Sequence, residues 1–227
     1  MHMGRNEYVK KLLIAGVVAV TLVVASGAWA NLSVGGKVWY ADVDGTKSAE
    51  PLYGPIASLD MGDFWVSGMF LFGQYDIAGL PAGVDASVDT KDAEAVLGYT
   101  WKILDIGAGA RYSVWTAKAA NDFGQSAQGD LAQWGPMVYA GLGDSFGKTP
   151  LGWYVAGSWM FYDLGDARDA KNESGGDAET FEHWNAEGGL FLHWQHLSAT
   201  LGYRYKQYIN ISDLKFQGPA ASASFVF

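Results

Sequence analysis

The sequence contains no cysteine among its 227 residues and only six prolines. Without cysteine the chain has neither a disulfide framework nor a thiolate metal site, and it has no cysteine nucleophile. Charged residues make up only 17% of the chain, and the formal net charge at pH 7 is −9. A nucleic-acid-binding protein presents a basic face, so this charge balance argues against nucleic acid as a partner.

A single long apolar run is present, and it lies at the N-terminus. Residues 1–11 carry three basic side chains, residues 12–25 are apolar and uncharged, and Ala28-Trp29-Ala30 follows. This is the three-part arrangement of a secretory signal peptide. The apolar part is too short to cross about 30 Å of hydrocarbon at about 1.5 Å per residue. We therefore expect a signal peptide of residues 1–30, cleaved after Ala30, and a mature domain of residues 31–227.

Aromatic residues and glycines are abundant, at 15% of the chain and 30 residues respectively. Aromatic side chains favour strands and glycines favour tight turns, so this composition is typical of a β-rich protein. No segment after the signal peptide has the roughly 18 apolar residues that a membrane helix needs. A mature chain in a membrane must then cross it as a closed β-barrel, because only helices and barrels satisfy every backbone group in lipid.

Ten segments of the mature chain alternate between apolar and polar residues with period two. In the ninth, Leu201 and Tyr203 share one face while Thr200 and Arg204 share the other. Most of these segments reach the roughly 9–11 residues of a tilted membrane strand, whereas soluble strands average about 5–6. The segments are 32–42, 53–61, 64–76, 92–102, 104–117, 132–144, 151–164, 180–194, 197–208 and 215–227.

The connections between these segments alternate between long and short. Long loops with short turns at the opposite end are typical of outer-membrane barrels, whose short turns face the periplasm. We therefore predict a transmembrane antiparallel up-and-down β-barrel of about ten strands. The count falls to eight if segment 53–61, weakened by Pro55, and its neighbour are not strands. The long connections are 43–52, 77–91, 118–131, 165–179 and 209–214, and the short ones are Gly62-Asp63, Ile103, 145–150 and Gln195-His196.

The C-terminus carries a resemblance to a known class. The chain ends in an amphipathic segment with Phe225 and a terminal Phe227. This resembles the sorting signal that the assembly machinery of bacterial outer-membrane barrels recognises. With the signal peptide and the loop pattern, the whole chain resembles the broad class of small outer-membrane barrels, such as the protein W and protein X groups. The resemblance implies an outer-membrane location and partners in membrane lipid, lipopolysaccharide and the barrel-assembly machinery.

Aromatic residues gather at the segment ends, where two girdles at the membrane interfaces are expected. These residues are Tyr40, Trp65, Trp101, Trp134, Trp153, Trp184, Trp194 and Tyr205.

Several charged residues fall on the faces predicted to point inward. A lipid-facing Arg or Lys costs about 2–4 kcal/mol at the membrane midplane, so these charges belong in the lumen. We expect the basic residues to pair with Glu94 and Glu187 across it, giving a largely filled lumen with at most a narrow passage for small solutes. The predicted lumen charge network is Lys37, Glu94, Arg111, His183, Glu187, Arg204 and Lys206.

Three other functions stay open at this point. The acidic long loops, with Asp76 and Asp92 as loop edges, are candidates for divalent cations, although no ligand spacing is present and no cofactor is expected. His196 and Ser198 have the His-x-Ser spacing seen in lipid A 3-O-deacylases, and i and i+2 share a strand face. Their place at a periplasmic turn argues against such a hydrolase. Finally, an apolar ligand pocket of Tyr154, Met160, Tyr162 and Phe191 forms if these residues point inward.

The competing fold is a soluble barrel of the calycin type. Period-two alternation does not distinguish inside from outside. A calycin would bury the apolar face and expose Lys37, Arg111 and Arg204 to water.

Overall fold

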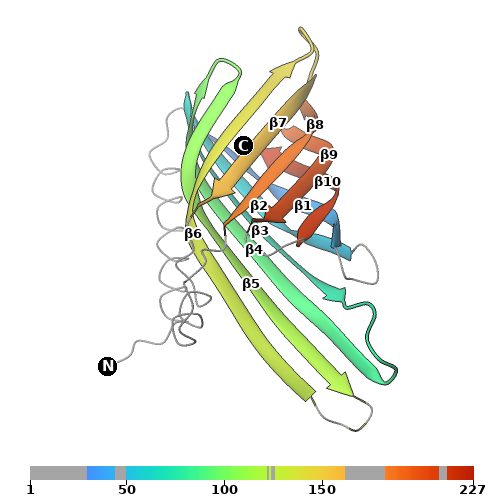
Figure 1. The fold of residues 1–227 in the computed structure, drawn as a ribbon. Helices are drawn as coiled ribbons and strands as arrows, with labels where there is room; N and C mark the ends of the chain where they lie inside the picture. Colours follow the sequence, from blue (N-terminus) through green and yellow to red (C-terminus); the bar gives the residue numbers. More distant parts are fainter. Residues whose placement is uncertain (1–29, 44–49, 122, 124–125, 162–181, 210–213) are drawn as a thin grey trace.

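In a computed structural model of the chain, the structure describes residues 30–43, 50–121, 123, 126–161, 182–209 and 214–227. They form ten antiparallel strands in one closed barrel, in which each strand pairs with its neighbours in sequence and β1 pairs with β10 (Figure 1). The predicted fold class and the count of ten are confirmed, and the alternative of eight is wrong. The strands are β1 (Asn31–Val43), β2 (Glu50–Met61), β3 (Phe64–Asp76), β4 (Val84–Trp101), β5 (Leu104–Asn121), β6 (Ser126–Ser145), β7 (Leu151–Met160), β8 (His183–Trp194), β9 (Leu197–Tyr208) and β10 (Lys215–Val226).

The weakest predicted strand, β2, accommodates Pro55 at a break in the pairing with β3. The register there passes from Tyr53↔Phe72 directly to Ile56↔Met69. Pro55 lies in this gap, where its missing N–H donor interrupts no regular ladder bond. Gly54 allows the close approach of the two strands, since a Cβ there would lie 1.9 Å from the carbonyl oxygen of Phe70.

Tight reversals gather at the end of the barrel that also holds Asn31 and Val226, which we call the turn end. Lys102 and Gln195 adopt positive φ values of 59° and 53° there, and Gly62 adopts 72°. Such angles let two-residue connections reverse the chain. We call the opposite end, where the longer connections lie, the loop end. The proposed signal peptide, apart from Ala30, lies outside the described residues.

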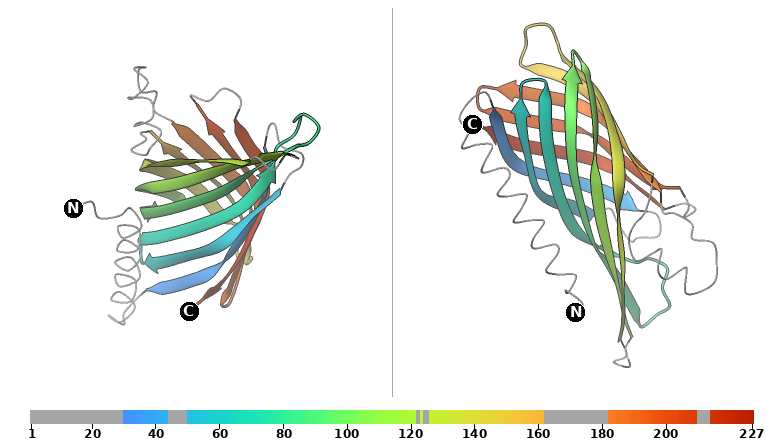
Figure 2. Two further views of the ribbon diagram at one scale, coloured as in Figure 1. Left: turned by 90° about the horizontal axis from the view of Figure 1, so that it is seen from below. Right: turned by 90° about the vertical axis from the view of Figure 1, so that its left-hand side faces the viewer.

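Three strands extend past the others at the loop end. β4, β5 and β6 continue as a long sheet beyond the barrel (Figures 1 and 2). The prediction of loops at 77–91 and 118–131 is therefore wrong for most of both segments. Residues 84–91 alternate well enough to pair with β5, from Val84↔Asn121 onward. Their acidic residues had favoured a loop.

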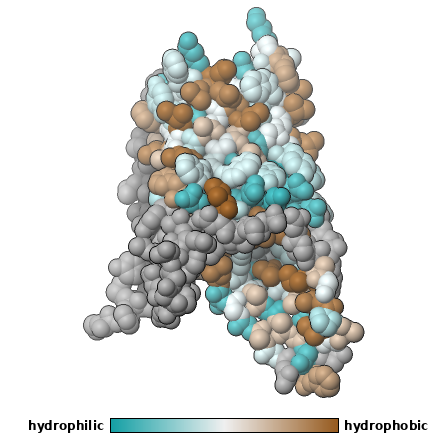
Figure 3. Space-filling model, viewed as in Figure 1, coloured by the Kyte–Doolittle hydropathy of each residue, from teal (hydrophilic) through white to brown (hydrophobic). Residues whose placement is uncertain are grey.

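The alternation sorts apolar side chains to the outside and charged ones to the inside. Leu201 is 64% exposed and Leu97 is 58% exposed, whereas Arg111 and Arg204 are 1% and 3% exposed. On the face in Figure 3, apolar residues gather over the turn-end half of the barrel. Exposing so many large apolar side chains to water is unfavourable, and it suits a lipid environment. The calycin alternative is wrong, because its basic residues would lie outside.

The expected aromatic girdles are present only in part. Tyr40, Trp101 and Trp194 are exposed on the exterior at the strand ends. Trp65 instead points into the barrel, where its ring packs against Tyr139 at 5.4 Å. The prediction that Trp65 belongs to a girdle is therefore wrong. Trp65 and Met69 are four residues apart on β3, so both point into the barrel. No helix among the described residues has the length and apolar character to cross a bilayer.

Candidate functional site: the barrel lumen

The centre of the lumen is crossed by ion pairs that converge on one oxygen of Glu94. Arg204 on β9 donates to Glu94 Oε1 at 2.6 Å, and Arg111 on β5 lies 2.7 Å from the same atom. β4 and β9 are on opposite sides of a ten-stranded barrel, so the Arg204 contact spans its diameter. Asn185 also donates to this oxygen at 3.3 Å, and Arg111 donates to Ser158 at 2.8 Å.

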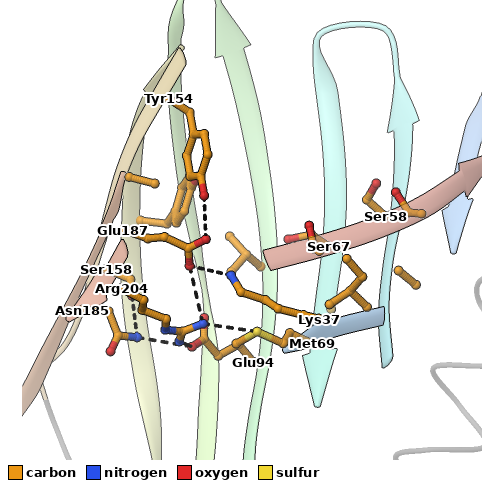
Figure 4. Close-up of a pocket in the computed structure, with 18 of the residues that line it drawn as sticks. Lys37, Ser58, Ser67, Met69, Glu94, Tyr154, Ser158, Asn185, Glu187 and Arg204 are labelled. Atoms are coloured by element: carbon orange, nitrogen blue, oxygen red, sulfur yellow. Dashed lines mark hydrogen bonds and ion pairs between the residues drawn. The ribbon is translucent and has the colours of Figure 1, made fainter. Parts of the chain in front are cut away.

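A second pair lies on the turn-end side of this contact. Lys37 on β1 donates to Glu187 Oε2 on β8 at 2.5 Å, and the Tyr154 hydroxyl donates to Glu187 Oε1 at 2.8 Å. Arg204 reaches Glu187 as well, at 3.8 Å, and so links the two carboxylates. The close-up in Figure 4 shows Arg204 between Glu187 and Glu94, with Lys37 reaching Glu187 from the other side. The sequence predicted that Lys37, Arg111 and Arg204 pair with Glu94 and Glu187, and the structure brings these five side chains together.

A third pair includes a residue that the sequence analysis placed elsewhere. Lys206 Nζ lies 3.1 Å from Asp92 Oδ2, and Ser113 donates to Asp92 Oδ1 at 2.7 Å. Asp92 is 3% exposed and lies within β4, so its assignment to a loop edge is wrong. Lys206 compensates its buried charge from the opposite wall. No sequence spacing relates β4 to β9, and the register of the closed barrel sets this contact.

His183 lies in the lumen without joining the ion pairs. Its side chain is fully buried and its ring packs on Tyr208, with the centroids 4.8 Å apart. Neither ring nitrogen has a hydrogen-bond partner among the described residues. His183 therefore points into the lumen as predicted, but it takes part in none of the ion pairs of the network.

Aromatic side chains fill the loop-end half of the lumen. Trp115 on β5 contacts Tyr208 on β9 and Phe216 on β10, with ring centroids 4.9 and 5.9 Å apart, so the contacts cross the barrel. Arg204 lies 5.0 Å from the ring of Trp39, which joins this layer to the charged one. We name the layer the aromatic plug; it comprises Trp39, Leu52, Leu71, Tyr75, Trp115, Tyr208 and Phe216.

The turn-end half of the lumen holds a cavity of about 350 Å³. Its floor is the charged layer, formed by Lys37, Glu94, Glu187 and Arg204. Its wall includes serines of β1, β2, β3, β9 and β10 on one side and Tyr139 and Tyr154 on the other.

The residues suggested for an apolar ligand pocket do not share one cavity. Tyr154 lines the cavity, but its hydroxyl is bound to Glu187. Met160 is buried against Val96 and Met137 and does not line the cavity. Phe191 is absent from the cavity lining, and Tyr162 lies outside the described residues.

The His-x-Ser pair is not assembled for catalysis. The Nδ1 atom of His196 lies 3.0 Å from the carbonyl oxygen of Val226, and its ring stacks on Phe225. Ser198 lines the cavity, and among the described residues no hydrogen bond joins it to His196. A general base must contact the hydroxyl that it activates. The part of the chain that the structure covers also contains no group of three or more acidic or histidine side chains placed to hold a metal ion.

Comparisons with known proteins bear on the fold. No family model matches the chain, and no curated sequence matches it significantly. Among solved structures, the translocator domain of the autotransporter NalP from Neisseria meningitidis is similar at 11% identity and a TM-score of 0.51, covering 96% of each chain. The attachment invasion locus protein Ail of Yersinia pestis is similar at 13% identity and 0.43, covering 87% of this chain and 97% of Ail.

The toluene transporter TodX of Pseudomonas putida is also similar, at 9% identity and a TM-score of 0.34, covering 88% of this chain and 89% of TodX. At these identities the likeness concerns the fold alone. Together with the apolar exterior and the buried charges, the likeness to the NalP translocator domain shows that this chain is a small antiparallel β-barrel of the transmembrane type.

Proposed function

We propose that the protein is a structural and surface component of the outer membrane whose lumen is closed to free diffusion. The observation that supports this most directly is the succession of two layers across the lumen. The ion pairs join opposite walls at its centre, and the aromatic plug fills its loop-end half. A barrel near eight strands is just wide enough for its side chains to fill it, and ten strands add little room.

The experiment is conductance in planar lipid bilayers. Wild-type protein is expected to give no large stepwise currents. A variant that combines Trp39→Ala, Trp115→Ala and Arg204→Ser removes bulk from both layers and is expected to conduct. The matched control carries Trp101→Ala and Trp194→Ala on the exterior and is expected to stay closed. Large currents from the wild type contradict the closed lumen, and a silent interior variant contradicts the assignment of the two layers as the barrier.

The C-terminal residues remain a prediction as an assembly signal. Phe225 and Phe227 are exposed on the exterior, and β10 pairs with both β1 and β9. Deletion of Phe227 is expected to lower the amount of folded barrel in the outer membrane without changing its melting temperature once folded. Unchanged yield in cells removes the idea.

The remaining proposed partners are lipopolysaccharide, and divalent cations at acidic positions of the loop end. Among the described residues, Asp76 and Asp85 lie there together. Carboxylates bind hard divalent cations, which bridge them to phosphate groups of lipid. A melting temperature lowered by EDTA supports cation binding, and an unchanged one contradicts it.

A further inference from the structure

A row of serine hydroxyls lines one wall of the turn-end cavity. Ser67, Ser58 and Ser33 are direct cross-strand partners on β3, β2 and β1, and Ser224 and Ser198 are partners on β10 and β9. All five line the cavity. We call them the serine row. Their register places neighbouring hydroxyls close enough to act on one ligand.

The opposite wall offers a different chemistry. Tyr139 and Tyr154 present aromatic rings, and Asn185 presents an amide. Figure 4 shows Tyr154, Glu187 and Asn185 on strands that face Ser58 and Ser67 across the space. An amide offers an acceptor and a donor side by side, and a carboxylate offers two acceptors. Both arrangements can bind neighbouring hydroxyls of a solute.

The floor of the cavity and the wall opposite the serine row contain polar atoms that lack hydrogen-bond partners among the described residues. Asn185 is 6% exposed and its Oδ1 atom has no hydrogen bond, and Arg204 is 3% exposed with Nε unpaired. Buried polar atoms are normally satisfied, so these groups are candidates for a bound solute or water. Lys37, Glu187 and Glu94 keep 12–15% of their side chains accessible although they lie within the barrel, and each lines the cavity.

The charges of this floor select against ionic ligands. Among the residues that line the cavity, Lys37 and Arg204 are matched by Glu94 and Glu187, so the lining has no net formal charge; Arg111, which shares Glu94 with Arg204, is fully buried and does not line the cavity. A charged ligand would break these pairs or leave one member unpaired, and either is costly in a buried site. An apolar ligand would leave the serine row and the floor without hydrogen bonds. Solute hydroxyls both donate and accept, and so complement every wall.

We propose that the turn-end cavity binds an uncharged polyhydroxylated solute of mono- or disaccharide size. Its volume of about 350 Å³ lies near the lower end of the roughly 300–1,000 Å³ typical of small-molecule sites. The site is reached from the turn end, which faces the periplasm in barrels of this kind. This inference rests on the proposed function: because the charged layer closes the lumen, the cavity is open at the turn end alone and can hold a solute without passing it on.

The test is a titration of the full mature barrel with sucrose. Binding is measured by saturation-transfer NMR in a deuterated detergent that has no sugar headgroup. Saturable binding is expected. Ser58→Leu with Ser198→Leu removes two hydroxyls and fills the cavity, and is expected to weaken binding by at least about tenfold. The matched control is Ser126→Leu, at the exposed loop-end tip of β6, with affinity unchanged. Ser198→Leu alone serves if the double variant does not show the gel mobility of a folded barrel.

Three results overturn the proposal. The first is the absence of saturable sucrose binding, the second is equal affinity in wild type and the cavity variants, and the third comes from two comparison probes. Glycine betaine and toluene are the comparison probes, and tighter binding of either than of sucrose also overturns the assignment of ligand class. Bilayer conductance is a separate readout, so a barrel that is closed but does not bind sucrose refutes this inference alone. A barrel that conducts refutes the closed lumen whatever it binds.

Discussion

Replacing Glu94 by glutamine tests how strongly the central ion pairs hold the barrel together. Glutamine keeps the shape of the side chain and an oxygen acceptor, but it removes the negative charge. That charge compensates two guanidinium groups, Arg204 at 2.6 Å and Arg111 at 2.7 Å, both almost completely buried. Among the described residues, Arg204 has a second carboxylate within 4 Å, since Glu187 lies 3.8 Å away, whereas Arg111 has none besides Glu94. Glu94→Gln thus leaves Arg111 without an anionic partner.

Removing one partner of a buried ion pair costs about 3–5 kcal/mol. Because two cations lose the same partner here, we expect a loss near the upper end, about 4–5 kcal/mol in the free energy of unfolding. This corresponds to a change of about a thousandfold or more in the unfolding equilibrium. The assay is reversible urea unfolding in lipid vesicles, followed by tryptophan fluorescence and by the gel mobility of unboiled samples.

The matched control is Asp89→Asn. Asp89 pairs with Lys118 at 2.5 Å, but both side chains are substantially exposed on the sheet beyond the barrel. Exposed pairs contribute about 0–1 kcal/mol, so we expect a change below 1 kcal/mol. A Glu94→Gln variant that loses no more than this control refutes the reasoning.

A companion variant separates charge imbalance from lost packing. Glu94→Met, Arg111→Met and Arg204→Met together replace the central charges by apolar side chains and leave the pair of Lys37 with Glu187 intact. Replacing a whole buried ion-pair network by apolar residues is often neutral or stabilising. The triple variant is therefore expected to recover most of the stability that Glu94→Gln loses. A triple variant as unstable as Glu94→Gln shows that packing, and not charge, explains the loss.

Three further predictions follow from the lumen. Trp115→Ala opens space in the aromatic plug and is expected to cost about 3–5 kcal/mol in urea unfolding, whereas Trp101→Ala on the exterior costs less than about 1 kcal/mol; equal losses contradict the plug. Tyr154→Phe removes a hydrogen bond to the Glu187 carboxylate and is expected to cost about 1.5–3 kcal/mol in the same assay, and a neutral result excludes that bond as a stabilising contact. Gly109→Val places a Cβ 1.9 Å from the carbonyl oxygen of Ala95, so the yield of barrel with folded gel mobility is expected to fall, and an unchanged yield contradicts the tight approach of β4 and β5.

The sequence predicted the strands where alternation and turn chemistry agree. The bounds of β9 were predicted to the residue, since Gln195-His196 precedes it and its two faces differ sharply from Leu197 to Tyr208. The same pattern identified Arg111 and Arg204 as inward-facing, because lipid excludes charge from the other face.

Other features depended on information that a single sequence does not contain. The pairing of Lys206 with Asp92 joins opposite walls, and its register follows from the closure of the whole barrel. The acidic residues Asp85 and Asp89 led to the prediction of a loop where β4 continues. A strand that extends beyond the membrane needs no apolar face, so its sequence can resemble that of a polar loop. Trp65 resembled a girdle residue by type, but its parity on β3 directs it inward.

The central claim is that charges are enclosed and apolar side chains face lipid, and the absence of native cysteine allows a direct test. Leu201→Cys and Ser198→Cys each introduce a single thiol on β9, on opposite faces. In lipid vesicles, Leu201→Cys is expected to react with a lipid-soluble maleimide and not with a charged one. Ser198→Cys is expected to react with the charged reagent supplied from the turn end. The reverse pattern would place the apolar face inside and contradict the account.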